Sequence, residues 1–108
     1  MAICARHEND LNQTKNDLMK INSTIDVLAV VADVSKKNDR ENFAKKVIAH
    51  FQTIDILVNN AGTFLPGNIA DEPEERLEFL WQTNVLSAYE ITRAFLPIMM
   101  EKKCGHIF

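Results

Sequence analysis

The segment Asp55-Ile56-Leu57-Val58-Asn59-Asn60-Ala61-Gly62 is the most informative part of this sequence about its fold. Its apolar run, Ile56 to Val58, is too short for a helix and ends in two amides, a small residue and a glycine. A continuous apolar strand of this kind is covered on both faces, as in a parallel sheet. Ligands of open α/β sheets bind beyond the carboxyl ends of the strands, so the amides stand where a binding cleft is expected. The glycine lets the backbone turn there or approach a ligand closely.

Strands and helices alternate on both sides of this stretch. Apolar, β-branched runs predict strands, and apolar residues at helical spacing predict helices. The predicted strands are 2–5, 27–32, 54–58 and one that begins at 106, and the predicted helices are 8–22, 35–51 and 72–103. Ser35 is expected to cap the second helix, and Asp71 with Glu74 has the spacing of a capping box before the third. The alternation predicts an α/β fold with a parallel sheet and helices on both faces.

Length and composition exclude several classes of protein. The 108 residues suffice for one domain and not for two. Twelve basic and fifteen acidic residues give a net charge of −3, which argues against a nucleic-acid surface or a polybasic membrane anchor. No apolar run approaches the ~20 residues that span a bilayer. Cys4 and Cys104 show no motif spacing, which favours two free thiols in a reducing cytoplasm, and no pair of histidines or cysteines has metal-site spacing.

Four pieces of sequence, in order, carry a resemblance to a known family. They are Cys4-Ala5-Arg6, Ala32-Asp33-Val34, Asn59-Asn60-Ala61-Gly62, and the group formed by Thr83-Asn84-Val85, Leu96-Pro97-Ile98-Met99 and Gly105-His106-Ile107. With these pieces the chain resembles the short-chain dehydrogenase/reductase (SDR) family over nearly its whole length. The resemblance implies a Rossmann-like, doubly wound parallel sheet with strand order 3-2-1-4-5. Residues 1–108 would then be a single partial NAD(P)-binding domain that lacks the first strand and the C-terminal part.

The resemblance also implies a set of cofactor-binding residues, namely Arg6, Asp33, Val34, Asn60, Ala61 and Gly62. Arg6 stands where NAD-preferring relatives commonly carry a carboxylate, so it would select NADP by pairing with the 2′-phosphate. In the alternative, Arg6 is solvated at the end of its strand and the cofactor is NAD. Asp33 would bond the adenine amino group and Val34 would cover the ring, although Asp33 also suits a helix start. Asn60 to Gly62 would line the adenosine ribose, and Asn59 would bridge neighbouring strands.

Asn84 is the candidate catalytic residue. It falls on an apolar helical stripe that contains Leu77, Trp81, Val85 and Phe95, and a buried amide there needs hydrogen-bond partners. In the family, the matching asparagine supports a water-linked proton relay to the catalytic lysine; the alternative is a satisfied core asparagine. A second apolar stripe on the same helix predicts a homo-oligomer formed through residues 72–103.

The glycine-rich phosphate loop of the family is absent from the chain, and its catalytic serine and tyrosine-x-x-x-lysine pair would lie after Phe108. We therefore interpret the chain as a segment of an NAD(P)-dependent oxidoreductase that transfers a hydride between a nicotinamide cofactor and a carbonyl or alcohol substrate. A non-catalytic nucleotide-binding or regulatory α/β module is the alternative. A phosphate-receiver domain is a third class, but it needs a carboxylate cluster and only Asp33 is available.

Strand pairing can also be predicted. In the order 3-2-1-4-5 that the resemblance implies, the missing first strand would sit at the centre. The strand ending at Arg6 should then pair with the strand ending at Asp33, and the strand ending at Val58 with the one starting at His106. The two pairs should then either close on each other or leave two unpaired apolar edges. Such edges invite aggregation, so residues 1–108 alone are expected to be poorly stable and inactive.

Overall fold

Two pairs of parallel strands form the sheets of the computed structural model, which describes residues 1–108. β1 (Ala2–Ala5) pairs with β2 (Leu28–Val31), and β3 (Ile56–Leu57) pairs with β4 (His106–Ile107). Both pairings and their parallel direction confirm the prediction. The two pairs remain separate sheets, and Val31, Ile56 and Val58 are between 50% and 61% exposed. Of the two outcomes expected, the structure shows the one with unpaired apolar edges.

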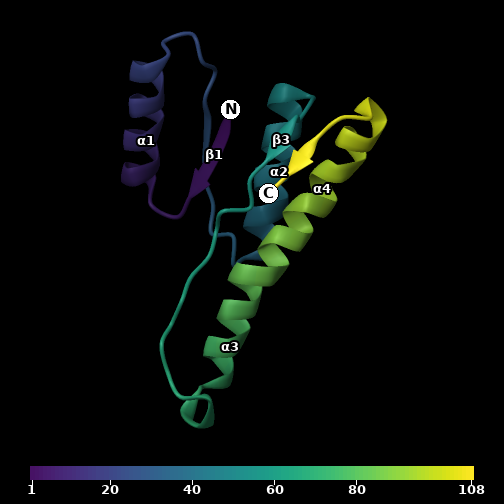
Figure 1. Ribbon diagram of the computed structural model, residues 1–108. Coiled ribbons are helices and arrows are strands. Elements are labelled where there is room, and N and C mark those ends of the chain that lie inside the picture. Colours follow the sequence, from purple (N-terminus) through teal and green to yellow (C-terminus); the bar gives the residue numbers. More distant parts are fainter.

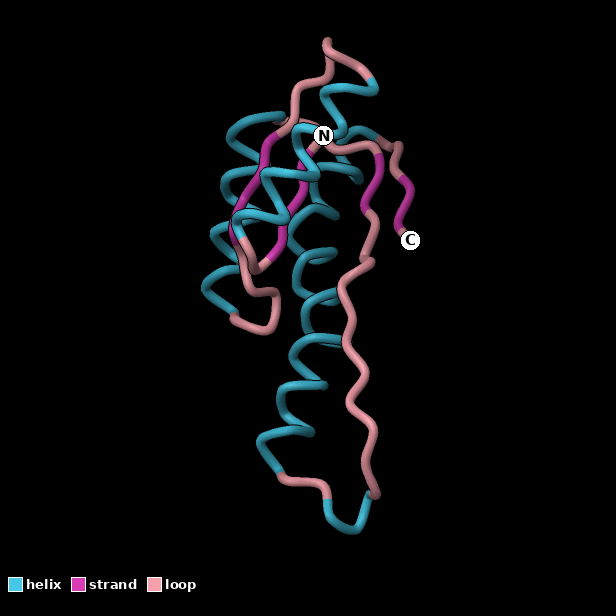
Figure 2. Tube along the Cα trace, turned by 90° about the vertical axis from the view of Figure 1, so that its left-hand side faces the viewer, coloured by secondary structure: helices cyan, strands magenta, loops and turns pink.

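Three helical regions connect the strands (Figure 1). Their elements are α1 (Glu8–Ile21), α2 (Lys37–Phe51), the short 3₁₀ turn η1 (Ile69–Asp71), α3 (Glu74–Trp81), the π-helical segment η2 (Gln82–Leu86) and α4 (Ser87–Lys102). The last three follow one another without a break, so a single long helix reaches Lys102 as predicted. The loop that precedes it runs beside this long helix (Figure 2).

One apolar cluster holds α2 and α4 against both strand pairs. Its nine buried residues are Val30, Ala32, Phe43, Ala44, Val47, Leu57, Ile91, Phe95 and Met99. The rings of Phe43 and Phe95 meet edge to face with their centroids 6.3 Å apart. Leu11 of α1 and Val27 are buried outside this cluster, and Figure 1 shows β1 between α1 and the pair α2–α4. Helices therefore cover both faces of the β1–β2 sheet, as the alternation of elements predicted.

Two predicted helix caps are wrong. Ser35 does not cap α2; its amide and hydroxyl bond the carboxylate of Asp33, and Lys36 precedes the helix without a side-chain cap. This local side-chain bond competes with capping. Asp71 does not cap α3 either, because it belongs to the turn η1 and Pro73 immediately precedes the helix. The third strand is also shorter than predicted, since β4 offers only two paired residues.

The predicted buried stripe on the long helix is confirmed at Phe95 but is wrong at its first positions. Leu77 and Trp81 are more than half exposed, and Asn84 is exposed. The buried positions are Thr83, Ser87, Ile91, Phe95 and Met99, of which only Phe95 belongs to the predicted stripe. These recur every four residues, wider than the 3.6-residue turn of a regular helix. A π-helical turn takes more residues than an α-helical one, so η2 changes which side chains face the core.

Candidate functional site

The carboxyl ends of β1 and β2 bring Arg6 and Asp33 side by side. The amide of Ala32 donates to the carbonyl of Ala5 at 3.0 Å, so the two chains leave the sheet at the same level. The positive charge of Arg6 is close enough to lower the pKa of Asp33. Arg6 itself is exposed. An exposed cation and a carboxylate thus share one edge of the sheet, as the sequence predicted.

Asp33 organises the turn that leaves β2. One carboxylate oxygen, Oδ1, accepts hydrogen bonds from the amide and the hydroxyl of Ser35 at 3.0 and 2.7 Å. Burial raises the pKa of Asp33, but the bonds from Ser35 and the charges of Lys36 and Arg6 outweigh burial and leave this pKa below its ordinary value. The carboxylate is therefore ionised at neutral pH. Its Oδ2 atom accepts no hydrogen bond from the protein and remains available to a ligand.

Two consecutive residues of α2 hold the backbone of the same turn. The carboxylate of Asp39 accepts the amide of Asp33 at 2.9 Å, and Nη1 of Arg40 donates to the carbonyl of Val34 at 2.7 Å. The sequence analysis did not identify either residue. A signal was present for Arg40, since it lies three and seven residues before Phe43 and Val47 and so falls on the buried stripe of α2.

The third piece of the site lies after β3 and faces the long helix. Asn84 brackets the peptide of Thr63: its Oδ1 accepts the Thr63 amide at 2.8 Å, and its Nδ2 donates to the Thr63 carbonyl at 2.9 Å. A side chain at Gly62 would reach ordinary contact distance from Oδ1 of Asn84, at 3.6 Å. Asn60, Ala61 and Gly62 are all exposed. The structure therefore brings Asn84 to the Asn-Asn-Ala-Gly segment, as an exposed residue rather than a core amide.

Asn59 anchors the end of β3. Its backbone amide donates to the carbonyl of Phe108 at 2.8 Å and extends the pairing with the β4 chain. Its side-chain Nδ2 donates to Oγ1 of Thr92 on α4 at 3.1 Å. The side chain thus binds a helix rather than a neighbouring strand, which corrects the prediction; only the backbone makes the strand-to-strand bond.

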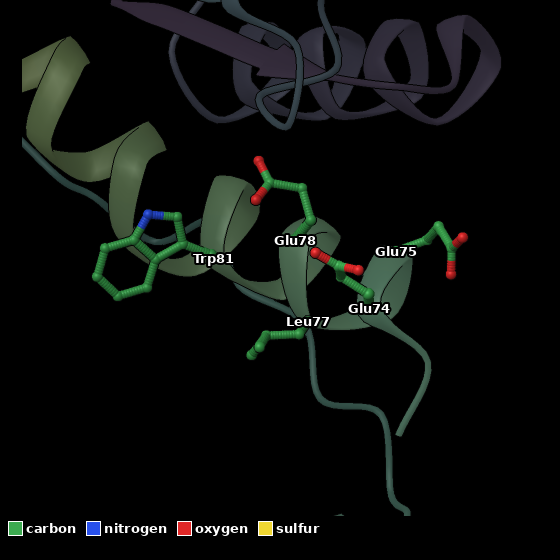
Figure 3. A pocket seen from close by; sticks show the side chains of 5 residues that line it. All are labelled: Glu74, Glu75, Leu77, Glu78 and Trp81. Carbon is green, nitrogen blue, oxygen red and sulfur yellow. The ribbon is translucent and has the colours of Figure 1, made fainter. Parts of the chain in front are cut away.

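Two shallow hollows lie on the long helix. One, of about 460 Å³, is lined by Glu74, Glu75, Leu77, Glu78 and Trp81 of α3. Figure 3 shows its three carboxylates pointing in different directions instead of toward one centre. The other, of about 450 Å³, is lined by Ala88, Tyr89, Thr92, Arg93 and Leu96 of α4. Neither contains a residue that the sequence assigned to the cofactor.

No group of three or more histidine, cysteine or acidic side chains could hold a metal ion. None of the helices combines the length and the apolar character needed to cross a bilayer. Cys4 and Cys104 are both free thiols, and burial raises the pKa of Cys4.

Among curated proteins, the chain is 36% identical over 81 residues to estradiol 17-beta-dehydrogenase 11 of Macaca fascicularis, which covers 75% of this chain and 27% of that protein. It is 32% identical over 107 residues to an uncharacterized oxidoreductase of Staphylococcus epidermidis, covering 99% of this chain and 44% of that one. The chain thus spans less than half the length of these relatives.

Solved structures give the same result. L-sorbose reductase from Gluconobacter frateurii, complexed with NADPH and L-sorbose, matches with a TM-score of 0.92 and 29% identity over 98% of this chain and 40% of that one. A metagenomic short-chain oxidoreductase in complex with NADP matches with a TM-score of 0.88 and 27% identity, over 98% and 48% of the two chains. The family model for short chain dehydrogenases matches residues 1–108. The chain therefore belongs to the short-chain dehydrogenase family, and its sheets and helices are part of that family's Rossmann fold.

Proposed function

We propose that residues 1–108 are the central part of an NADP-dependent oxidoreductase that transfers a hydride between the nicotinamide and the carbon of a carbonyl or alcohol group. The observation that carries this proposal is the placement of Arg6 and Asp33 at the shared carboxyl edge of β1 and β2, where the charge of Arg6 acts on Asp33. The L-sorbose reductase and the metagenomic enzyme, which bind NADPH and NADP, support it.

The residues present suit the adenosine half of the cofactor. Arg6 is an exposed cation that would pair with a 2′-phosphate, and Oδ2 of Asp33 is an acceptor left open for the adenine amino group. Val34 would cover the ring. Ala61 and Gly62 carry almost no side chain and are exposed, so a ribose could approach their backbone closely. When bound, NADPH supplies the hydride.

Asn84 would support proton transfer. Its bonds to Thr63 use one hydrogen of Nδ2 and one lone pair of Oδ1, so each atom keeps one further hydrogen-bonding position. Because Asn84 is exposed, a water molecule can occupy those positions. We propose that this water belongs to the proton relay that leads to the catalytic lysine of the complete protein.

The test compares NADP with NAD in the full-length polypeptide that contains these residues. Arg6→Ala should weaken NADP binding by about 1–3 kcal/mol, the value of charge-assisted hydrogen bonds, and leave NAD binding nearly unchanged. Lys37→Ala, which removes an exposed cation from the start of α2, is the control and should alter neither. Equal losses for both cofactors, or tighter NAD binding before mutation, would refute the role of Arg6. NADP binding without turnover of any carbonyl compound would favour a non-catalytic nucleotide-binding module.

We also propose that the complete protein assembles through its long helix. Large apolar side chains remain exposed there, namely Leu77, Trp81, Tyr89, Leu96 and Met100. Such a contiguous apolar face is usually covered by a partner. Leu96→Glu should dissociate the oligomer in sedimentation velocity, whereas Met19→Glu on α1, at a site of similar exposure (41% against 39%), should leave it intact. Equal behaviour of the two variants would contradict this interface. The free thiols are the basis for a cytoplasmic location, which is part of the same proposal.

A further inference from the structure

Arg40 is the most deeply buried charged residue of the chain, at 2% exposure. Each of its nitrogens has a partner from a different element. Nε forms an ion pair with Oε2 of Glu90 on α4 at 2.8 Å, Nη2 donates to Oε1 of Gln82 at 3.1 Å, and Nη1 donates to the carbonyl of Val34 at 2.7 Å. The guanidinium thus joins the turn after β2 to the long helix.

The position of the turn depends on this contact. Val34 follows Asp33, whose amide is held by Asp39, so α2 binds one backbone donor and one backbone acceptor of the same turn. Of these two bonds, only the one to Val34 also depends on the long helix, because Glu90 of α4 and Gln82 of η2 orient the guanidinium. Moving Arg40 would therefore release the Val34 peptide while leaving the Asp33 amide held.

We propose that Arg40 is a positioning residue for the adenine end of the cofactor site, acting through the Val34 peptide; this inference rests on the function proposed above. A buried guanidinium cannot leave its carboxylate without a large desolvation cost, so Glu90 holds Arg40 in one geometry. The planar fork of arginine then serves three acceptors at once, which a lysine ammonium on a flexible stem cannot reproduce. An alternative role, a cross-link that only joins α2 to α4, would not distinguish one end of the cofactor from the other.

The experiment separates these roles with a truncated cofactor. Reduced nicotinamide mononucleotide lacks the adenosine half of NADPH, so it cannot use the turn that Arg40 holds. In the full-length polypeptide, Arg40→Lys should raise the dissociation constant of NADPH, measured by fluorescence titration, about tenfold, the effect of losing one charge-assisted hydrogen bond. The kcat/KM with the mononucleotide should stay within about twofold of the unmodified protein.

Arg76 provides a matched control. It also contacts a carboxylate, Glu72 at 3.3 Å, and a backbone carbonyl, that of Pro66 at 2.8 Å, but at the loop beside α3. Arg76→Lys should lower the melting temperature without a selective loss of NADPH affinity relative to the kcat/KM with the mononucleotide. Unchanged NADPH affinity in Arg40→Lys, or equal losses with both cofactors, would overturn the inference.

A second variant covers the case in which Arg40→Lys does not fold. Glu90→Gln keeps an acceptor for Nε but removes the charge that orients Arg40, and it should show the same selective loss at about threefold. If Glu90→Gln instead weakens NADPH binding and lowers the kcat/KM with the mononucleotide by the same factor, the inference is also overturned. If the unmodified protein binds neither NADPH nor the mononucleotide, the proposed function itself is wrong, and this result is distinct from either variant outcome.

Discussion

The hydrogen-bonded pair between Asn84 and the Thr63 peptide allows a residue-level test. Asn84→Ala removes both bonds, of 2.8 and 2.9 Å, and leaves the Thr63 amide and carbonyl to solvent. A single bond contributes about 0.5–1.5 kcal/mol net, and exposure of the site places this pair at the lower end, so the local loss should be about 1–2 kcal/mol. Amide hydrogen exchange at Thr63 in the full-length polypeptide should accelerate about tenfold, because 1.4 kcal/mol corresponds to one decade.

Asn84→Asp separates the structural from the chemical role. The carboxylate still accepts the Thr63 amide but has no donor for the Thr63 carbonyl, which it would face at a similar distance. The Thr63 amide should therefore stay protected in this variant, while turnover falls in both variants if the amide group of Asn84 serves the proton relay. Asn68→Ala is the control, because the side chain of Asn68 lies in the same loop and makes no capping hydrogen bond to η1. If the Thr63 amide of Asn84→Ala exchanges within about twofold of the rate in the unmodified protein, the two hydrogen bonds of Asn84 do not hold this peptide.

Two further predictions concern stability. Phe95 is only 2% exposed and packs its ring against that of Phe43, so Phe95→Ala should lower the free energy of unfolding, measured by urea titration, by about 3–5 kcal/mol. Met100→Ala, at a residue that is 66% exposed, should lower it far less, and equal losses in the two variants would contradict the described core. The pKa of Asp33 lies below its ordinary value of 3.8, so its stabilising contribution is present above that value and is lost as the pH falls through the lower folded value. Asp33→Asn should remove this part of the acid dependence in melting curves recorded from about pH 5 to about pH 2, and parallel curves would count against it.

Much of the fold follows from local pattern. Short apolar runs separated by helical segments indicate parallel strands joined by crossover connections. The two pairings followed from the strand order 3-2-1-4-5 that the family resemblance implies. The same logic placed Arg6 beside Asp33, since parallel strands end at the same edge of a sheet. The Asn-Asn-Ala-Gly segment was likewise predictable as an exposed strand end.

Which side chains of the long helix face the core could be seen only in the folded chain. A regular 3.6-residue period from Leu77 to Phe95 predicts a buried Asn84, but the π-helical segment η2 changes the number of residues per turn and exposes it. Backbone hydrogen bonding of this kind leaves no signal in the apolar periodicity of the sequence.

The burial of Arg40 also depends on the folded chain. An arginine on a helix is by default solvated, and it is buried here because three acceptors, at positions 34, 82 and 90, converge on it from segments up to fifty residues away in sequence. Burial of a charge requires partners, and partners distant in sequence meet only in the folded chain.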